Sequence, residues 1–122
     1  MSAEPFVWHE LVTSDQEKSG WFFKKLLGWE TKQVDAGEFG VYTLFQKDGK
    51  DIAGMMNPTP DTPKQAAYWH SYIAVEDVDG CAEAAPEIGG TVLVPPHDIA
   101  DVGRICIVAD PMGAVAHLIT PL

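Results

Sequence analysis

The sequence contains one pattern written twice, and this repeat limits the folds that the chain can adopt. The two copies are 62 residues apart and align without gaps from an apolar run, through an acidic turn, to a glycine. The matching pairs are Trp8 and His70, Asp15 and Asp77, and Gly28 and Gly90. A repeat of half the chain cannot form a solenoid, because a solenoid stacks at least about three short units. The repeat therefore predicts two similar modules, with a ligand cleft expected where the modules meet.

The first copy predicts the element order β-α-β-β-β. Phe6–Thr13 has the composition of a strand. The segment Ser14-Asp15-Gln16-Glu17 has the pattern of a capping box, in which Ser14 is the N-cap of the helix that follows. We expect this helix to end at Gly28, since glycine adopts the left-handed conformation at little cost. Three further strands are predicted at Trp29–Val34, Phe39–Gln46 and Ile52–Met56.

The second copy repeats this order after a proline-rich segment. Asn57–Lys64 contains three prolines, which is typical of an extended linker between modules. A strand is predicted at Tyr68–Val75, and a helix from Val78 to Ile88 that Pro86 should kink or shorten. The remaining strands are expected at Thr91–Val94, Arg104–Val108 and Ala114–Thr120, with His97 in a loop. The whole chain therefore predicts an α+β protein with eight strands and two helices.

Charge and composition exclude several classes of partner. The net charge of −10 argues against nucleic acid, because phosphate binding needs clustered lysine and arginine. No segment approaches the roughly 20 apolar residues of a membrane-spanning helix, so we expect no membrane partner and a cytoplasmic protein. Cys81 and Cys106 lack the spacing of a metal site and are expected to be free thiols. An acidic domain is suited to cationic or neutral small molecules.

The two copies resemble the vicinal-oxygen-chelate superfamily, which includes glyoxalase I, extradiol dioxygenases, epimerases and the bleomycin- and fosfomycin-resistance proteins. The resemblance lies in the segments FVWHELVTSDQEKSGWFFKKLLGW and YWHSYIAVEDVDGCAEA and in the ending DPMGAVAHLITPL. It implies one glyoxalase-like domain over residues 1–122, with module one at 1–57, a proline linker at 58–64 and module two at 65–122. It also implies an α+β fold in which tandem βαβββ modules form an eight-stranded curved sheet, or cup, with the helices on its convex face.

The resemblance further implies where a divalent metal would bind. Metal ligands in this superfamily lie on the first and last strands of each module, which places them at His70 and His117. The matching positions of the first module are Trp8 and Ala53, or Met55 if the longer turn shifts the register. None of these three side chains binds a hard divalent metal. Whether a metal is bound is therefore open, and a metal-free cup is an equal or stronger alternative.

Glu10 is the candidate catalytic residue. It lies two residues after Trp8, and because strand side chains alternate between faces, both are expected to face the cup. Glu10 with His70 and His117 would make a two-histidine, one-carboxylate set, or a base beside two imidazoles suited to proton transfer. His9 is expected to point to the opposite side of the strand.

Two classes of function are open. The first is a glyoxalase-like enzyme, a lyase, isomerase or epimerase, that acts on a small oxygenated substrate with Glu10 as base. The second is a non-catalytic binder that sequesters a cationic drug or metabolite, as the bleomycin-resistance proteins do. In both cases the candidate ligand-binding residues are Trp8, Met55 and Tyr72. Short strands at the module ends also predict a homodimer.

Overall fold

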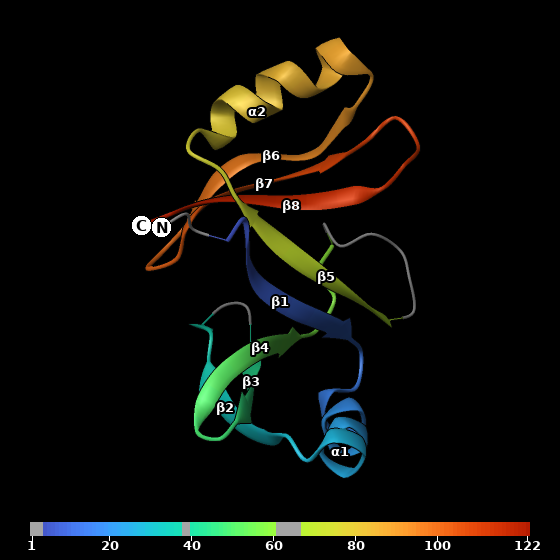
Figure 1. Ribbon diagram of the computed structural model, residues 1–122, viewed down its shortest axis with the longest axis vertical. Helices are drawn as coiled ribbons and strands as arrows, with labels where there is room; N and C mark the ends of the chain where they lie inside the picture. Colours follow the sequence, from blue (N-terminus) through green and yellow to red (C-terminus); the bar gives the residue numbers. More distant parts are fainter. Residues whose placement is uncertain (1–3, 38–39, 61–66) are drawn as a thin grey trace. The chain divides into compact units, whose positions relative to one another are not determined.

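A computed structural model describes residues 4–37, 40–60 and 67–122 (Figure 1). The chain divides into two compact units. The first unit is Trp8–His70, and the second is Ser71–Leu122 together with the start of the chain up to Val7. Most of the predicted linker, including Pro63, lies outside the described residues. The module boundaries inferred from the repeat stay a prediction, because these units are defined by packing and not by sequence similarity.

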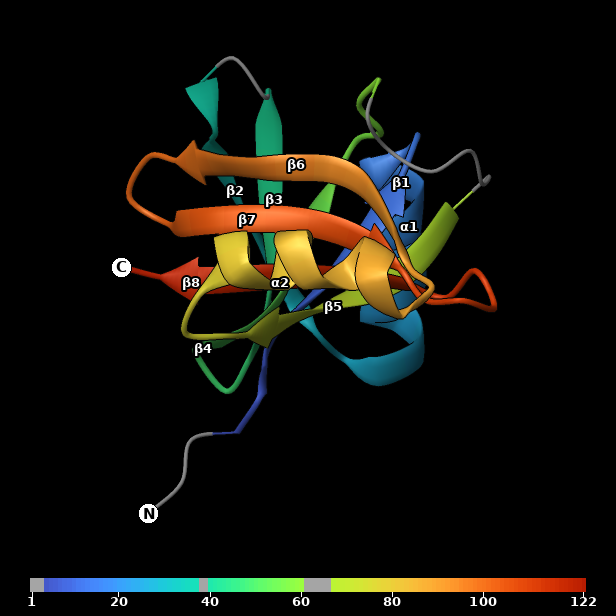
Figure 2. The same cartoon turned by 90° about the horizontal axis from the view of Figure 1, so that it is seen from above.

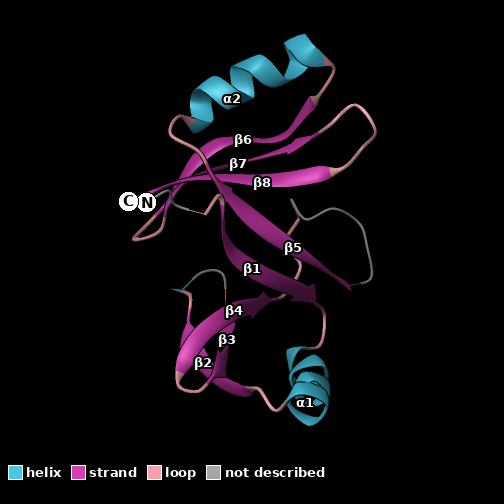
Figure 3. Ribbon diagram, in the orientation of Figure 1, coloured by secondary structure: helices cyan, strands magenta, loops and turns pink. Residues whose placement is uncertain are grey.

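The predicted α+β fold is confirmed. Eight strands form one mixed sheet in the order β2-β3-β4-β1-β5-β8-β7-β6, accompanied by two α-helices (Figures 1 and 3). The elements of the first half are β1 (Phe6–Thr13), α1 (Gln16–Leu27), β2 (Glu30–Asp35), β3 (Val41–Lys47) and β4 (Lys50–Met56). Those of the second half are β5 (Ala67–Ala74), α2 (Val78–Ala84), the 3-10 turn η2 (Ala85–Ile88), β6 (Thr91–Ile99), β7 (Gly103–Ala109) and β8 (Val115–Pro121).

Both halves follow one pairing scheme. The first strand of each half pairs in parallel with the last, as β1 does with β4 and β5 with β8. The other pairs within each half, β2 with β3, β3 with β4, β6 with β7 and β7 with β8, are antiparallel. Among the described residues, no helix is long and apolar enough to span a membrane.

The helix ends follow the repeated sequence signals, with one correction. The N-cap of α1 is Asp15 and not Ser14, because the Asp15 carboxylate accepts the backbone N–H of Lys18 at 2.9 Å. The predicted N-cap is therefore wrong by one residue, and the residue three positions after Asp15 is Lys18, which cannot complete a capping box. Gly28 ends α1 in the left-handed conformation, with φ of 78°, as expected. In the second unit Pro86 has the predicted effect, since α2 ends at Ala84 and continues only as a 3-10 turn.

Strand β6 is longer than predicted. The sequence indicated a strand that ends at Val94 and a loop containing His97, whereas β6 runs from Thr91 to Ile99. The strand passes through Pro95 and Pro96, with register shifts against β7 on either side of Val94. Proline lacks the N–H that a central strand needs, but β6 is at the end of the strand order, and among the described strands it pairs with β7 alone. His97 is therefore an exposed edge-strand residue.

Each unit packs a hydrophobic core beneath its own helix. In the first unit the core is largely aromatic, since the fully buried Phe45 is surrounded by Phe23, Trp29 and Trp69. In the second unit α2 lies along β6, β7 and β8 (Figure 2), and Val78 and Cys106 are its most buried side chains.

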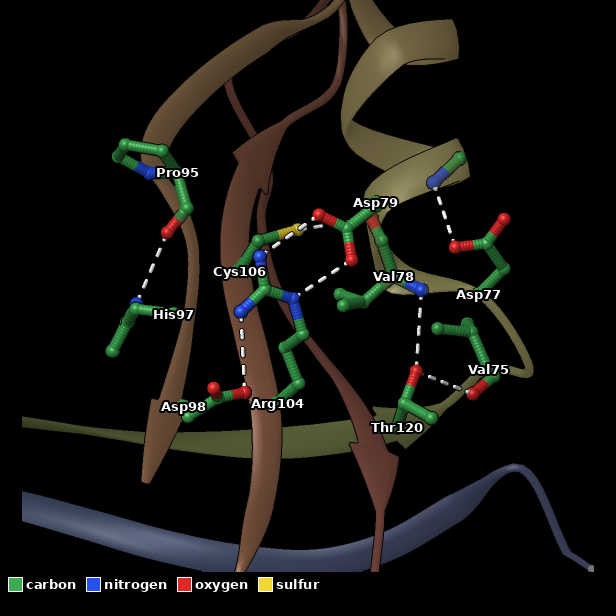
Figure 4. Close-up of polar contacts among 11 residues, drawn as sticks. Val75, Asp77, Val78, Asp79, Pro95, His97, Asp98, Arg104, Cys106 and Thr120 are labelled. Atoms are coloured by element: carbon green, nitrogen blue, oxygen red, sulfur yellow. Dashed lines mark hydrogen bonds and ion pairs between the residues drawn. The ribbon is translucent and has the colours of Figure 1, made fainter. Parts of the chain in front are cut away.

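Charged and hydroxyl side chains fasten α2 to the sheet of the second unit (Figure 4). Arg104 on β7 donates two hydrogen bonds to Asp79 on α2, from Nε at 2.8 Å and from Nη2 at 3.0 Å. A third donor of Arg104, Nη1, reaches Asp98 on β6 at 3.2 Å. The Thr120 hydroxyl on β8 accepts the backbone N–H of Val78, the first residue of α2. One arginine thus links three elements of the unit.

Candidate functional site

The first unit gathers polar side chains on the face of its strands that points away from α1. Trp8 and Glu10 come from β1, Tyr42 from β3, and Tyr68 and His70 from β5. We call this set the Glu10 site. It forms because alternate residues of a strand share a face, while Leu11, Phe45 and Ala53 on the opposite face build the core beneath α1.

Glu10 is buried and is held through both of its carboxylate oxygens. Its side chain is only 5% exposed, and that of His70 is 8% exposed. Nε2 of His70 lies 2.9 Å from Oε1 of Glu10. The Tyr42 hydroxyl donates to Oε2 of Glu10 at 2.7 Å and accepts the indole N–H of Trp8 at 2.8 Å. Burying a carboxylate lowers the stability of the fold unless the carboxylate is hydrogen-bonded, and this arrangement supplies hydrogen bonds to both oxygens.

The negative charge of Glu10 affects both tyrosines of the site. Burial raises the pKa of Tyr42 far above its ordinary value, and the charge of Glu10 raises it further, against an opposing effect of the Trp8 hydrogen bond. The pKa of Tyr68 is also raised, first by burial and then by Glu10. Tyr42 therefore keeps its proton at neutral pH and remains a hydrogen-bond donor to Glu10.

Gly54 on β4 makes room for this arrangement. It is the partner of Glu10 in the parallel register of β1 and β4. A Cβ atom at position 54 would overlap the hydroxyl end of the Tyr42 ring. Sequence reasoning identified neither Gly54 nor Tyr42, because no motif marks them. Both residues can be located only from the register of β3, β4 and β1, which cannot be inferred from the sequence.

Met55 lies elsewhere, contrary to the expectation that it shares a face with Trp8. It is 1% exposed and packs with Leu11, Phe45 and Ala53 beneath α1. The physical reason is the alternation of β4, where Gly54 and not Met55 points to the Glu10 side. Met55 lines a cavity of about 180 Å³ between α1, β2 and β3, on the opposite face from Glu10. His9 is exposed on β1.

The second unit contains the other two predicted residues, Tyr72 and His117. They are partners in the parallel register of β5 and β8, and their rings meet edge to face with centroids 5.4 Å apart. His117 is buried, and its neighbours along β8, Leu118 and Thr120, alternate with it toward the α2 side. Tyr72 and His117 therefore occupy the face of their unit that points away from its helix, as Glu10 does in the first unit.

A metal site needs several donor side chains grouped around one point. Across residues 4–37, 40–60 and 67–122, no three His, Cys, Asp or Glu side chains are grouped to hold a metal ion. Within the first unit, Glu10 and His70 supply two donors, fewer than the roughly three that catalytic metal sites use, and these donors bond each other. The first unit by itself does not fit a divalent metal. A site that combines it with His117 stays a prediction.

Comparison with curated proteins places the chain in a family. The pattern that defines the Glyoxalase/Bleomycin resistance protein/Dioxygenase superfamily matches residues 6–118. A protein named as a glyoxylase, CFP32 of Mycobacterium bovis, is 35% identical over 114 residues, covering 91% of this chain and 43% of that protein. The anthracycline biosynthesis protein DnrV of Streptomyces peucetius is 32% identical over 119 residues, covering 88% and 43%. The chain thus spans less than half the length of these curated relatives.

Solved structures show the same fold. A variant of the Streptomyces coelicolor methylmalonyl-CoA epimerase, in complex with 2-nitronate-propionyl-CoA, matches with a TM-score of 0.64 and 19% identity, covering 98% of this chain and 99% of that one. The methylmalonyl-CoA epimerase of Mycobacterium tuberculosis gives a TM-score of 0.63 at 15% identity, covering 100% and 93%. At such identities the likeness concerns the fold alone. The superfamily pattern covers nearly the whole chain, and on that ground the chain belongs to the Glyoxalase/Bleomycin resistance protein/Dioxygenase superfamily.

Proposed function

We propose that the protein is an acid–base enzyme of the epimerase or isomerase type, which removes a proton from carbon in a small oxygenated substrate. Glu10 is the catalytic base in this proposal. The observation that carries it is the buried Glu10 carboxylate, with Tyr42 hydrogen-bonded to one oxygen and His70 at hydrogen-bond distance from the other. A base whose position is fixed before substrate arrives loses less orientational freedom in the transition state.

The side chains around Glu10 are suited to this chemistry. A hydrogen on carbon next to a carbonyl group becomes acidic when the developing oxyanion is stabilised by hydrogen-bond donors. Histidine is the side chain that exchanges protons near neutral pH, so His70 can pass on a proton that Glu10 has accepted. Trp8 and Tyr68 offer aromatic surface for the apolar part of a ligand.

The names of the relatives suggest substrates to try. Two structural neighbours are methylmalonyl-CoA epimerases, and one curated relative is named as a glyoxylase. Methylmalonyl-CoA carries a hydrogen next to its thioester carbonyl group, and the hemithioacetal of a 2-oxoaldehyde carries one next to its other carbonyl group, which is the chemistry proposed for Glu10. We therefore choose methylmalonyl-CoA and the hemithioacetal of methylglyoxal as probes.

Hydrogen exchange in heavy water tests the proposal without assuming the product. The protein is incubated with each probe in D2O, and loss of the substrate's carbon-bound proton is followed by NMR. We expect the wild type to exchange this proton with at least one probe, and Glu10→Gln to slow the exchange by about 10² to 10⁴-fold. Equal exchange rates in the two proteins would remove Glu10 from the proposal. His9→Ala is the control variant, because His9 is exposed on the same strand.

The alternative function, sequestration of a cationic drug or metabolite, is favoured by one observation. Residues 8–70 carry seven lysines against nine acidic residues, whereas the rest of the chain carries Arg104 against nine acidic residues. The net charge is therefore −2 in the first unit and −8 in the second. Titration of protein fluorescence with a cationic anthracycline tests this, since one relative is named for anthracycline biosynthesis. Micromolar binding that falls with added salt, together with no exchange in D2O, would favour the binder.

We also propose that the protein is a cytoplasmic homodimer. The free thiols of Cys81 and Cys106 suit a reducing compartment. Trp21, Phe22 and Leu26 leave apolar surface exposed on α1, and such a surface is suited to a protein contact. Sedimentation that shows a monomer at micromolar concentration would count against the dimer.

A further inference from the structure

The first unit lacks a side chain at a position where the second unit has a histidine. In each unit the first and last strands pair in parallel, with Glu10 opposite Gly54 and Tyr72 opposite His117. Because Glu10 and Tyr72 are themselves 62 residues apart in the repeat, Gly54 is the positional counterpart of His117. The last strand of the first unit therefore has no side chain at the position that the second unit fills with an imidazole.

The hydroxyl end of Tyr42 occupies that space. A Cβ atom at position 54 would overlap the Tyr42 oxygen and the ring carbons next to it, so any residue larger than glycine would displace the ring. A clash with the end of a side chain can be relieved by moving that side chain. The movement here would break the hydrogen bond from Tyr42 to Glu10.

Chemistry fixes the direction of the hydrogen bonds through Tyr42. The indole N–H of Trp8 can only donate, so the Tyr42 oxygen accepts from it. An ionised carboxylate can only accept, so the Tyr42 hydroxyl donates to Glu10. Trp8 thus orients the hydroxyl group, and the hydroxyl group holds one oxygen of Glu10.

We infer that Tyr42 is the positioning residue of the Glu10 site and that Gly54 is the residue that admits it. This inference rests on the proposed role of Glu10 as a base. Tyr42 is hydrogen-bonded to the proposed base, so we expect its effect in the rate of proton transfer and not in substrate binding. The first unit thereby uses a hydroxyl from β3 at the place where the second unit uses His117 from β8.

Three single variants of the full chain test the inference. Tyr42→Phe removes the hydroxyl and keeps the ring, and Gly54→Ala adds the Cβ that displaces it. Gly20→Ala is the matched control, because Gly20 is also buried in the first unit but a Cβ there meets Met55 and Thr31 at ordinary distances of 3.5 and 3.7 Å. Each variant is measured for kcat and KM in the D2O assay. The Trp8 indole N–H, identified with Trp8→Phe, is followed by NMR for its chemical shift and hydrogen exchange.

We expect Tyr42→Phe and Gly54→Ala to lower kcat by about tenfold to a hundredfold, the effect of losing one hydrogen bond to a charged group, with KM little changed. Both should also shift the Trp8 indole signal and speed its hydrogen exchange, since its acceptor is lost or moved. Gly20→Ala should leave both readouts as in the wild type. An unchanged indole signal in Tyr42→Phe overturns the inference, and this variant decides the matter if Gly54→Ala does not fold. If the wild type exchanges neither probe, the proposed function fails, while the indole readout still decides whether Tyr42 and Gly54 form this arrangement.

Discussion

The two units of the chain share a backbone plan and differ in the chemistry placed on it. The half of the chain from β1 to β4 and the half from β5 to β8 each contain a strand, a helix and three further strands, and each pairs its first strand in parallel with its last. The registers correspond, since Glu10 lies opposite Gly54 in the first unit and Tyr72 opposite His117 in the second. The two halves thus share their order of elements and their strand pairing, whereas the side chains at single paired positions differ and give each half a different chemistry.

The cores of the two units differ as much as their polar faces. The first unit packs aromatic rings around Phe45, and all four tryptophans of the chain lie between residues 8 and 69. The second unit packs smaller side chains such as Ile105 and Cys106. Tryptophan fluorescence therefore reports on the first unit only, while circular dichroism reports on both. This difference allows the units to be perturbed and observed separately.

The largest expected effect comes from the aromatic core. Phe45→Ala should lower the free energy of unfolding by about 3–5 kcal/mol, because it removes a fully buried ring and leaves a cavity. Ile105→Val in the second unit removes a single methylene group and should cost about 0.5–1.5 kcal/mol. Urea unfolding followed by tryptophan fluorescence and by circular dichroism measures both.

Phe22→Ala is the control for this comparison. Phe22 is in the same unit as Phe45 but is 49% exposed, so its removal should change stability by about 0.5 kcal/mol or less. A loss in Phe45→Ala no larger than that in Phe22→Ala would show that the ring does not hold the core together.

The second expected effect is a loss of stability in alkali that originates in the first unit. Burial raises the pKa of Tyr42 above the ordinary tyrosine value of 10.0. The contribution of this raised pKa to the free energy of unfolding is therefore complete below pH 10.0. It is lost as pH rises toward the pKa of Tyr42 in the folded state. The expected slope is about 1.4 kcal/mol for each pH unit. Thermal unfolding between pH 8 and 11 should show a smaller alkaline loss in Tyr42→Phe than in the wild type.

Glu10→Gln provides the complementary measurement. The charge of Glu10 contributes to the raised pKa of both Tyr42 and Tyr68, so its removal should lower both values. Ultraviolet titration of tyrosinate absorbance measures this shift. If the titration curves of Glu10→Gln and the wild type coincide, Glu10 does not face these rings.

Much of the fold could be predicted from the sequence because its signals are local. The repeat gave the order of elements, and Gly28 and Pro86 act on the backbone within one helical turn. The segment Ser14-Asp15-Gln16-Glu17 predicts Ser14 as the N-cap, but both Ser14 and Asp15 can cap a helix, and only the structure shows that the N–H of Lys18 bonds to Asp15. The extension of β6 through Pro95 depends on its place at the edge of the sheet, which is a property of the whole topology.

The Glu10 site could be predicted only in part, for the same reason. The spacing of Trp8 and Glu10 fixes their common face, because both lie on one strand. The contact with Tyr42 depends on how β3, β4 and β1 align, and a shift of one residue would exchange the faces of β4. That dependence explains why the sequence pattern predicts the wrong face for Met55 and does not identify Gly54.

The third prediction concerns a feature that the two units share. Asp15 accepts the N–H of Lys18 at 2.9 Å, and Asp77 accepts that of Gly80 at 3.1 Å, so both helices begin at an equivalent cap. Asp15→Ala and Asp77→Ala should each lower the free energy of unfolding by about 1 kcal/mol. Ser14→Ala should have a smaller effect than Asp15→Ala in urea unfolding. The opposite ranking would restore Ser14 as the cap.

The smallest expected effect compares the ion pairs that join each helix to its sheet. In the first unit Lys24 on α1 lies 3.7 Å from Glu30 at the start of β2, with both side chains exposed. In the second unit the guanidinium of Arg104 holds Asp79 through two hydrogen bonds. A bidentate arginine is geometrically defined, whereas a single exposed lysine pair contributes little. Removing Arg104 should therefore affect the attachment of α2 to its sheet more than removing Lys24 affects the attachment of α1.

The pKa of Asp79 is the most direct measure of this difference. The hydrogen bonds from Arg104 are the largest cause of a pKa below the ordinary value of 3.8. The associated stability is present above pH 3.8 and is lost as pH falls through the lowered pKa. Arg104→Gln should return the NMR titration of the Asp79 carboxyl carbon toward 3.8, with only a small change in unfolding. Lys24→Gln should leave it unaffected, because Lys24 belongs to the other unit. If Asp79 titrates alike in Arg104→Gln and the wild type, the arginine does not hold α2, and the two helices are anchored by their cores alone.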